Sequence, residues 1–190
     1  MYKLKIIVST VRPSRKGPLV AQWIAEEARQ NGHFEVDILD LAEIGLPLMN
    51  EAAHPVMKQY EHAHTKQWSA TIDEADAFIF VTAEYDYSYP ASLKNALEYL
   101  VHEWAYKPSG IVSYSGGPFA GVRAVISLKS DLINFRNVAL AEVVNIPTVG
   151  EFISEDGVFV SNDRLTKAAT QMLTQLVRWT KGMKAIKEDQ

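Results

Sequence analysis

Short apolar runs alternate along the chain with longer stretches in which apolar residues recur at helical spacing. The runs Lys3 to Ser9 and Asp76 to Thr82 are almost continuously apolar at their centres, which is typical of strands covered on both faces. Phe34 to Leu39 alternates apolar and polar residues, and Ser109 to Ser115 predicts a further strand. The region Val138 to Val149 predicts a fifth strand or two short pieces.

Helical patterns separate these runs. The first predicted helix starts with Pro18, which suits the first helical position, and ends at Asn31-Gly32. Further helices are predicted at His54 to Ala75, Ala91 to Trp104, Phe119 to Phe135 and Arg164 to Lys184. Ala42 to Ala53 is predicted to be a loop, and the stretch EFISEDGVFV could form a small hairpin around Asp156-Gly157.

This alternation of strands and helices predicts an α/β fold with a parallel sheet between two layers of helices. Right-handed crossovers place successive helices on the faces of such a sheet. At 190 residues the chain fits one domain, so we expect residues 1–190 to form a single doubly wound unit. Ligands of such folds bind beyond the carboxyl ends of the strands, which directs attention to the loops there.

Composition narrows the function classes. The content of 47% hydrophobic and 22% charged residues is that of an ordinary globular protein. The net charge of -4, with basic residues thinly spread after the first turn, argues against nucleic acid as a partner. There is no cysteine, no apolar run of the roughly 20 residues that a membrane span needs, and no pattern of a secretory signal at the start. We therefore expect a cytoplasmic protein without a membrane partner.

The turn after the first strand is rich in hydrogen-bond donors. It runs from Ser9 to Gly17 and contains Thr10, Arg12, Ser14, Arg15 and Lys16. Hydroxyls, forked guanidinium donors and the N–H groups at the start of the next helix together suit an anion such as a phosphate. The spacing matches neither G-x-x-x-x-G-K-[ST] nor G-x-G-x-x-G, which disfavours the nucleotide folds that use those turns. A solvated basic turn with a hydroxyl cap on the helix is the alternative.

Two later loops also follow predicted strands. Tyr85, Tyr87 and Tyr89 could form a wall for a flat heteroaromatic ring, although the pattern alone slightly favours a tyrosine-rich turn packed on its neighbours. Gly116 and Gly117 would let the backbone pass close to a ligand. A flavodoxin-like strand order of 2-1-3-4-5 would bring all three loops to one edge of the sheet, with a phosphate in the first loop and a ring at the other two.

In these three loops the chain resembles the NADPH-dependent FMN reductases, a family that includes quinone, azo and chromate reductases. That family's loops read G-S-x-R-x-x-R/S, P-E-Y-N-x-S-x-P-x-x-L-K-N-A-x-[DE] and S-x-G-G-x-x-G-x-R-A. The corresponding segments here are 9–15, 83–98 and 115–124, within a match over about residues 3 to 150. Ser9 stands where the family has Gly, Ala83 where it has Pro, and Asp86 where it often has Asn.

The resemblance implies a flavodoxin-like three-layer sandwich with a five-stranded parallel sheet that binds FMN and takes hydride from NADPH. The residues that it implies for cofactor binding are Ser9, Thr10, Arg12, Ser14, Arg15, Lys16, Gly17, Glu84, Tyr85, Asp86, Tyr87, Ser88, Ser115, Gly116 and Gly117. Arg15 and Lys16 are also candidates for the NADPH 2′-phosphate. The flavin carries the chemistry, so no catalytic acid, base or nucleophile is expected, and the electrons pass to a small-molecule acceptor.

The resemblance also implies a homodimer or a homotetramer, in which a second copy covers the flavin. Apolar residues that would suit such a surface are Leu46, Leu48, Met49, Tyr99 and Trp104. Serine at position 9 would still offer its N–H to the phosphate. An ionised Asp86 near the flavin would lower the flavin potential, unless its side chain turns away to cap the following segment.

Two other functions fit the same pattern. A flavodoxin-type electron carrier would share the fold and FMN, although Arg12 and Arg15 argue against it, since such carriers usually offer hydroxyls to the phosphate. A binding module that has lost its flavin is suggested only by the three departures from the family motifs. No metal site is expected at His62 and His64 with His54, because residues two apart on a helix point to different faces.

Overall fold

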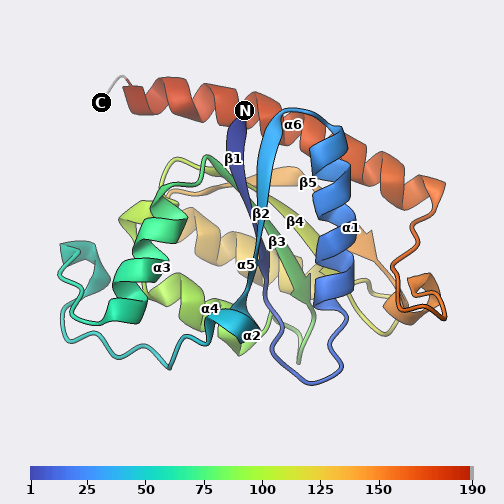
Figure 1. Cartoon of the computed structure of the whole chain (residues 1–190), viewed down its shortest axis with the longest axis horizontal. Helices are drawn as coiled ribbons and strands as arrows, with labels where there is room; N and C mark the ends of the chain where they lie inside the picture. Colours follow the sequence, from blue (N-terminus) through green and yellow to red (C-terminus); the bar gives the residue numbers. More distant parts are fainter. Residues whose placement is uncertain (189–190) are drawn as a thin grey trace.

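Five parallel strands form one sheet in the order β2-β1-β3-β4-β5 in the computed structural model, which describes residues 1–188 (Figure 1). The strands are β1 (Tyr2–Val8), β2 (Phe34–Asp40), β3 (Ala77–Ala83), β4 (Pro108–Tyr114) and β5 (Val138–Ile146). The predicted order 2-1-3-4-5 is confirmed, and the fifth strand is a single element with a register shift beside Ser109 and Ile111 of β4.

Two layers of helices cover the sheet (Figure 1). On one face lie α1 (Gly17–Gln30) and α6 (Asp163–Glu188), and on the other lie α3 (Ala63–Asp73), α4 (Ala91–Glu98) and α5 (Val122–Asn134). Alternating residues of β1 serve the two cores: Leu4 and Ile6 pack with α1 and α6, and Ile7 packs with the opposite layer. Because both faces are covered, β3 and β4 are buried along their whole lengths, and for β3 the apolar run predicts this.

The helix predicted at His54 to Ala75 is wrong over its first half. Residues 54–62 contain only the short 3-10 helix η1 (Pro55–Met57), and α3 begins at Ala63. Lys58 ends η1 with φ +51, a left-handed conformation that cannot continue a right-handed helix, and Met57 is exposed where an apolar stripe would have buried it. The start of the loop predicted at Ala42 to Ala53 belongs instead to the short helix α2 (Leu41–Ile44), which Gly45 ends at φ +64.

The helix predicted at Ala91 to Trp104 is also interrupted. After α4 ends at Glu98, the chain turns and forms the 3-10 helix η2 (His102–Trp104). Trp104 folds back so that its indole N–H donates to the carbonyl of Leu97 at 3.2 Å, and both Tyr99 and Trp104 are completely buried. The prediction that these two side chains form a partner surface is therefore wrong, whereas Leu48 is 84% exposed.

The remaining elements differ from the predictions mainly in length. The helix predicted at Phe119 to Phe135 begins at Val122, and α6 begins at Asp163 and runs to Glu188. After the 3-10 helix η3 (Val149–Phe152), the predicted small hairpin around Asp156-Gly157 is present as one antiparallel bridge between Ile153 and Phe159. None of the helices within residues 1–188 combines the length and the apolar character that a bilayer span requires.

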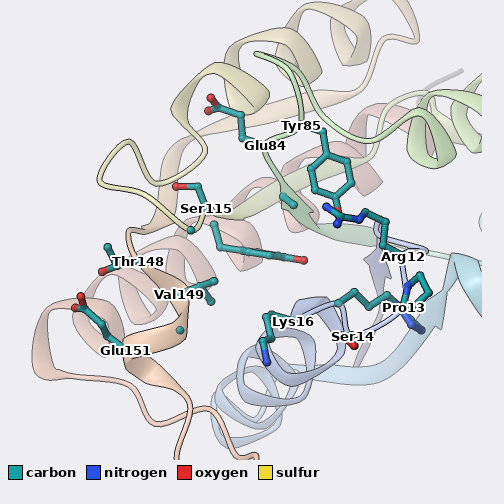
Figure 2. A pocket seen from close by; sticks show the side chains of 15 residues that line it. Arg12, Pro13, Ser14, Lys16, Glu84, Tyr85, Ser115, Thr148, Val149 and Glu151 are labelled. Carbon is teal, nitrogen blue, oxygen red and sulfur yellow. The ribbon is translucent and has the colours of Figure 1, made fainter.

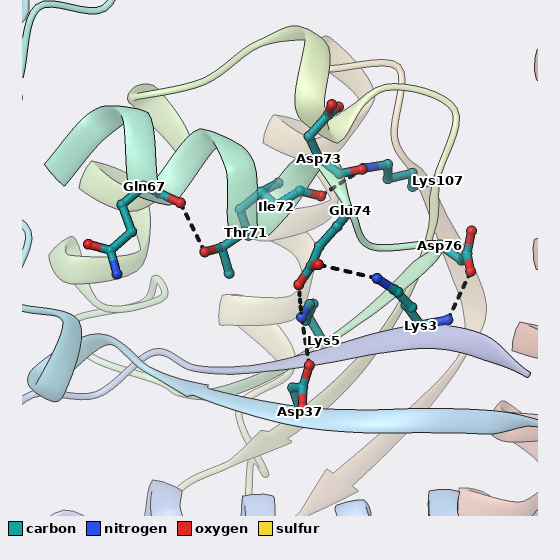
Figure 3. A network of polar contacts seen from close by, with 10 residues as sticks. All are labelled: Lys3, Lys5, Asp37, Gln67, Thr71, Ile72, Asp73, Glu74, Asp76 and Lys107. Carbon is teal, nitrogen blue, oxygen red and sulfur yellow. Dashed lines mark hydrogen bonds and ion pairs between the residues drawn. The ribbon is translucent and has the colours of Figure 1, made fainter. Parts of the chain in front are cut away.

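A polar network lies away from the carboxyl ends of the strands (Figure 3). The ammonium of Lys5, on β1, pairs with Asp37 of β2 at 2.6 Å and with Glu74 just after α3. The buried ammonium of Lys107 donates to the carbonyls of Ile72 and Asp73 at 2.7 and 2.8 Å. These bonds satisfy carbonyls at the end of α3 and tie that helix to the start of β4.

Candidate functional site

The loops that follow β1, β3, β4 and β5 surround a cavity of about 630 Å³ at the carboxyl edge of the sheet (Figure 2). Its lining consists of residues 12–16, 83–85, 114–116 and 148–151. The first three segments belong to the loops that the sequence predicted, and the strand order brings them together as expected. The fourth segment, after β5, was not predicted to contribute.

The first loop presents cations and an open helix end to this cavity. Arg12, Ser14 and Lys16 lie along its wall, and α1 starts directly after them without any side-chain cap. The N–H groups of the first helical turn are therefore not bonded by a capping side chain, and they carry the positive end of the helix dipole. Such a helix start is suited to hold a phosphate.

Gly17 allows this helix start to approach the sheet closely. A Cβ atom at this position would lie 2.6 Å from the hydroxyl oxygen of Thr10 and 2.9 Å from a methyl group of Val8. Thr10 itself is buried beneath the loop, where its hydroxyl lies 3.3 Å from that of Tyr114. Thr10 and Gly17 therefore shape the loop from below and do not line the cavity.

The prediction that Ser9 offers its backbone N–H to a phosphate is wrong. Its backbone N–H donates to the carbonyl of Val81 at 3.0 Å and so continues the hydrogen bonding between β1 and β3. This N–H is consequently unavailable to a phosphate, contrary to expectation. The side chain is completely buried, and its hydroxyl has no partner among residues 1–188.

Arg15 is held by an acidic residue that the sequence reasoning overlooked. Its guanidinium nitrogen Nη2 lies 2.5 Å from the carboxylate of Asp40, the last residue of β2. Both side chains are largely buried, with 18% and 10% of their surfaces exposed. Arg15 is therefore not a free cation like Arg12, and its assignment to the NADPH 2′-phosphate has to be weighed against this bond.

The second loop contains a tight turn at its tip. Tyr85 and Ser88 exchange backbone hydrogen bonds of 2.8 and 2.9 Å, and the two residues between them have positive φ angles, +46 for Asp86 and +69 for Tyr87. This is the geometry of a type I′ turn, in which Asp and Asn are favoured at the first central position. Asp86, Tyr87 and Ser88 lie outside the cavity lining, and only Glu84 and Tyr85 of the predicted residues of this loop belong to it.

An ion pair joins the second loop to the third. The carboxylate of Glu84 accepts hydrogen bonds from the Nε atom of Arg123, at 2.6 Å, and from the backbone N–H of the same residue, at 3.2 Å. The guanidinium of Arg123 also lies over the rings of Tyr87 and Phe119, at 4.0 and 4.7 Å from their centres. These contacts fix the distance between the two loops on one side of the cavity.

The third and fourth loops are joined through their backbones. The N–H of Thr148 donates to the carbonyl of Gly117 at 3.0 Å, and the N–H of Val149 donates to the carbonyl of Ser115 at 2.9 Å. A Cβ atom at Gly116 or Gly117 would meet nothing within 4 Å, and of these two predicted site residues Gly116 belongs to the cavity lining and Gly117 does not. Position directly after a strand was the one signal that could have identified Thr148 and Val149.

The cavity has a cationic wall at the first loop and a neutral, aromatic region beside Tyr85 and Tyr114. Arg12 and Lys16 make one wall cationic, and the guanidinium of Arg12 lies 5.6 Å from the ring centre of Tyr85. The phenol of Tyr114 lies in the lining next to Thr10, and burial raises its pKa to about 12, which keeps it neutral. The site can hold an anion at the first loop and a flat ring between Tyr85 and the Gly116 segment.

His62 and His64 were predicted to lie on one helix and to point to different faces, and this is wrong. His62 precedes α3 instead of lying within it, and its ring stacks on that of His64 with 5.1 Å between the ring centres. Both rings contact Asn50, through its carbonyl and its side-chain oxygen. No cluster of three or more metal-ligating side chains occurs within residues 1–188.

Comparison with known proteins identifies the family. The model of a family described as NADPH-dependent FMN reductase matches residues 2–151. The chain belongs to the NADPH-dependent FMN reductase family. This reductase-family chain is 41% identical over 116 residues to an NAD(P)H-dependent FMN reductase of Schizosaccharomyces pombe, an alignment that covers 60% of this chain and 58% of the relative.

Other matches extend over more of the chain. A quinone reductase of Pseudomonas putida is 31% identical over 142 residues, 70% of each chain. An NADPH azoreductase of a Bacillus species is 26% identical over 185 residues, which covers 97% of this chain and 93% of the relative. The solved structure of the FerB flavoenzyme of Paracoccus denitrificans, an NAD(P)H:(acceptor) oxidoreductase, superimposes with a TM-score of 0.76 at 21% identity and covers 96% of this chain and 99% of that structure. This structural likeness supports the flavodoxin-like fold.

Proposed function

We propose that the protein is an NADPH-dependent FMN reductase that transfers two electrons through bound FMN to a small acceptor. The observation that carries the proposal is the uncapped start of α1, which opens beside Arg12, Ser14 and Lys16 into a cavity of about 630 Å³. The position of this loop after β1, in a member of the FMN reductase family, makes the FMN phosphate its natural ligand.

The residues present fit FMN. The phosphate would lie against segment 12–17, and the ring would lie between Tyr85 and the backbone of Gly116, where no side chain fills the space. FMN, when bound, supplies the hydride and electron chemistry. The chain supplies binding, orientation and exclusion of water, and no side chain is assigned as an acid, base or nucleophile.

The electron donor and the acceptor are proposed by class. We infer NADPH as donor, with Lys16 as the exposed cation for its 2′-phosphate, because Arg15 is already bonded to Asp40. A quinone, an azo compound, a metal oxyanion or free flavin would serve as acceptor. Relatives named quinone reductase and azoreductase support this class without selecting one member of it.

A homodimer or homotetramer is proposed as the functional form. The support for it is that the segment after β2 presents apolar side chains to solvent, above all Leu48, with Leu46 and Met49 partly buried beside it. Cytoplasmic location remains a prediction, based on composition. The absence of cysteine is compatible with a reducing compartment.

The test is anaerobic addition of NADPH to the FMN-loaded protein while the absorbance of the flavin is followed. We expect rapid and complete bleaching, followed by recovery of the oxidised spectrum when a quinone is added. A bound flavin that stays oxidised would contradict the reductase and favour an electron carrier. A protein that never binds FMN would favour a module that has lost its cofactor.

A further inference from the structure

The first loop contains a guanidinium whose hydrogen bonding is only partly satisfied by the chain. Arg15 donates from Nη2 to Asp40, but its Nε atom is buried and has no partner within residues 1–188. A buried donor without an acceptor is unfavourable, so such groups in native proteins usually meet a ligand or a bound water. The Nε atom is enclosed by the protein, but Arg15 lines the cavity and its side chain is 18% exposed, so the guanidinium donors that Asp40 does not use can meet a ligand oxygen there.

The carboxylate of Asp40, which pairs with Arg15, is hydrogen-bonded at both of its oxygens. One carboxylate oxygen of Asp40 accepts the N–H of Ala42 at 3.0 Å and thereby caps α2, and the other accepts from Arg15 at 2.5 Å. With both oxygens bonded and 10% of the side chain exposed, the carboxylate has little freedom to rotate. A guanidinium bonded to a fixed carboxylate is fixed in turn, since its donors form a planar, rigid fork.

We propose that Asp40 is a positioning residue that holds Arg15 so that its remaining donors bind the FMN phosphate. The proposal rests on the proposed function as far as FMN is the ligand of the cavity. In this arrangement Arg12, which has no salt bridge within residues 1–188, attracts the anion by its charge, whereas the Asp40–Arg15 pair contributes a fixed geometry.

The negative charge of Asp40 also repels a phosphate, and the balance of the two effects decides the direction of the prediction. The repulsion acts across the intervening guanidinium and is weakened by solvent at the open side of the cavity. The charge-assisted hydrogen bond between Arg15 and the phosphate acts at contact distance and depends strongly on alignment. We therefore expect loss of Asp40 to weaken phosphate binding.

The experiment compares FMN with riboflavin, which lacks the phosphate, in titrations followed by flavin fluorescence. Asp40→Asn keeps the size of the side chain and an oxygen for the cap on α2. Its affinity for FMN should fall about tenfold, the low end for a hydrogen bond to a charged group, while its affinity for riboflavin stays within about twofold of wild type. Unchanged or tighter FMN binding would overturn the proposal, and so would an equal loss for riboflavin, which would indicate a merely structural role.

A matched control and a second variant complete the test. Asp37→Asn makes the same change on the same strand, at a carboxylate that pairs with Lys5 away from the cavity (Figure 3), and should leave FMN affinity unchanged. Arg15→Lys keeps the charge beside Asp40 but lacks the planar fork of guanidinium donors, and should lose FMN selectively even if Asp40→Asn unfolds. Adding Asp40→Asn to Arg15→Lys should cause little further loss; full additivity would contradict the proposed coupling.

These titrations need no NADPH, so they separate the inference from the proposed function. Selective loss of FMN in the variants, together with a wild-type flavin that NADPH fails to bleach, would keep the positioning role and reject the reductase. A wild-type protein that binds no FMN would reject both.

Discussion

Replacement of Gly121 by alanine tests whether the start of α5 depends on close contact with the sheet. Gly121 precedes α5 with φ +80, a conformation that residues with a Cβ atom rarely adopt. A Cβ atom there would lie 2.9 Å from the Cβ atom of Ser113 and 3.1 Å from the backbone nitrogen of Tyr114, both in β4. These neighbours are a buried side chain and sheet backbone, so neither can move away easily.

Two unfavourable terms add at this position. The left-handed backbone conformation is unfavourable by about 1–2 kcal/mol for a residue other than glycine. Overpacking against β4 adds about 1–3 kcal/mol. Alanine also reduces the conformational entropy of the unfolded chain, which offsets about 0.4–1 kcal/mol of this destabilisation. We therefore expect Gly121→Ala to lower the free energy of unfolding by about 3 kcal/mol, and to weaken FMN binding because the third loop shifts.

Two other glycines separate these terms in a urea unfolding assay. Gly32 has φ +78 but no atom within 4 Å of a Cβ, so Gly32→Ala should lose only about 1 kcal/mol. Gly117 has neither a left-handed φ nor a close neighbour, and Gly117→Ala should change stability by less than about 0.5 kcal/mol. If Gly121→Ala is no more destabilising than Gly32→Ala, the argument from close packing on β4 is refuted.

Three further changes probe the site and the network at the opposite edge. Arg12→Ala should weaken FMN binding by about 1.5–3 kcal/mol, because a donor to a charged phosphate is lost, and unchanged affinity in a fluorescence titration would remove Arg12 from the site. Asp86→Asn should leave the flavin midpoint potential unaltered, because the side chain is exposed at the tip of a turn outside the cavity lining; a raised potential in a redox titration would contradict this placement. Burial lowers the pKa of Lys107 from 10.5 to about 7, so between these pH values the unfolded chain binds a proton that the folded chain does not, and stability should rise with pH across this window. Lys107→Met should remove that rise, and parallel curves of unfolding free energy against pH for the two proteins would show that the lysine keeps its ordinary pKa.

Much of the fold follows from local patterns. The nearly continuous apolar runs of β1 and β3 predict burial on both faces, and their alternation with amphipathic stretches predicts the layered sheet. The strand order then places the loops after β1, β3 and β4 at one edge, and these loops do line one cavity. Arg12, Lys16, Tyr85 and Gly116 could accordingly be identified as candidate site residues before the structure was known.

Errors arose where a residue's role depends on a partner far away in the sequence. Trp104 lies in an apolar helical pattern, yet the chain bends so that its ring packs against that of Phe78, with 5.1 Å between the ring centres. Met57 suits an apolar stripe and is nevertheless exposed, because Lys58 takes a left-handed conformation after a single 3-10 turn. Local propensity describes only neighbours along the chain: for Trp104 tertiary packing overrode it, and at Met57 the backbone conformation of Lys58 ended the helical pattern.

The sequence by itself therefore determined the layer architecture and three of the four loops that meet at the site, since apolar periodicity and loop chemistry are local properties, and the strand order followed from the resemblance of those loops to a known family. Only the tertiary structure decided which polar groups remain available to a ligand. The N–H of Ser9 donates to Val81, one guanidinium nitrogen of Arg15 donates to Asp40 while its other donors stay open within residues 1–188, and Glu84 is bonded to Arg123. Each of these bonds joins residues that lie at least 25 positions apart, and so the donors left for a ligand become known only when the chain is folded.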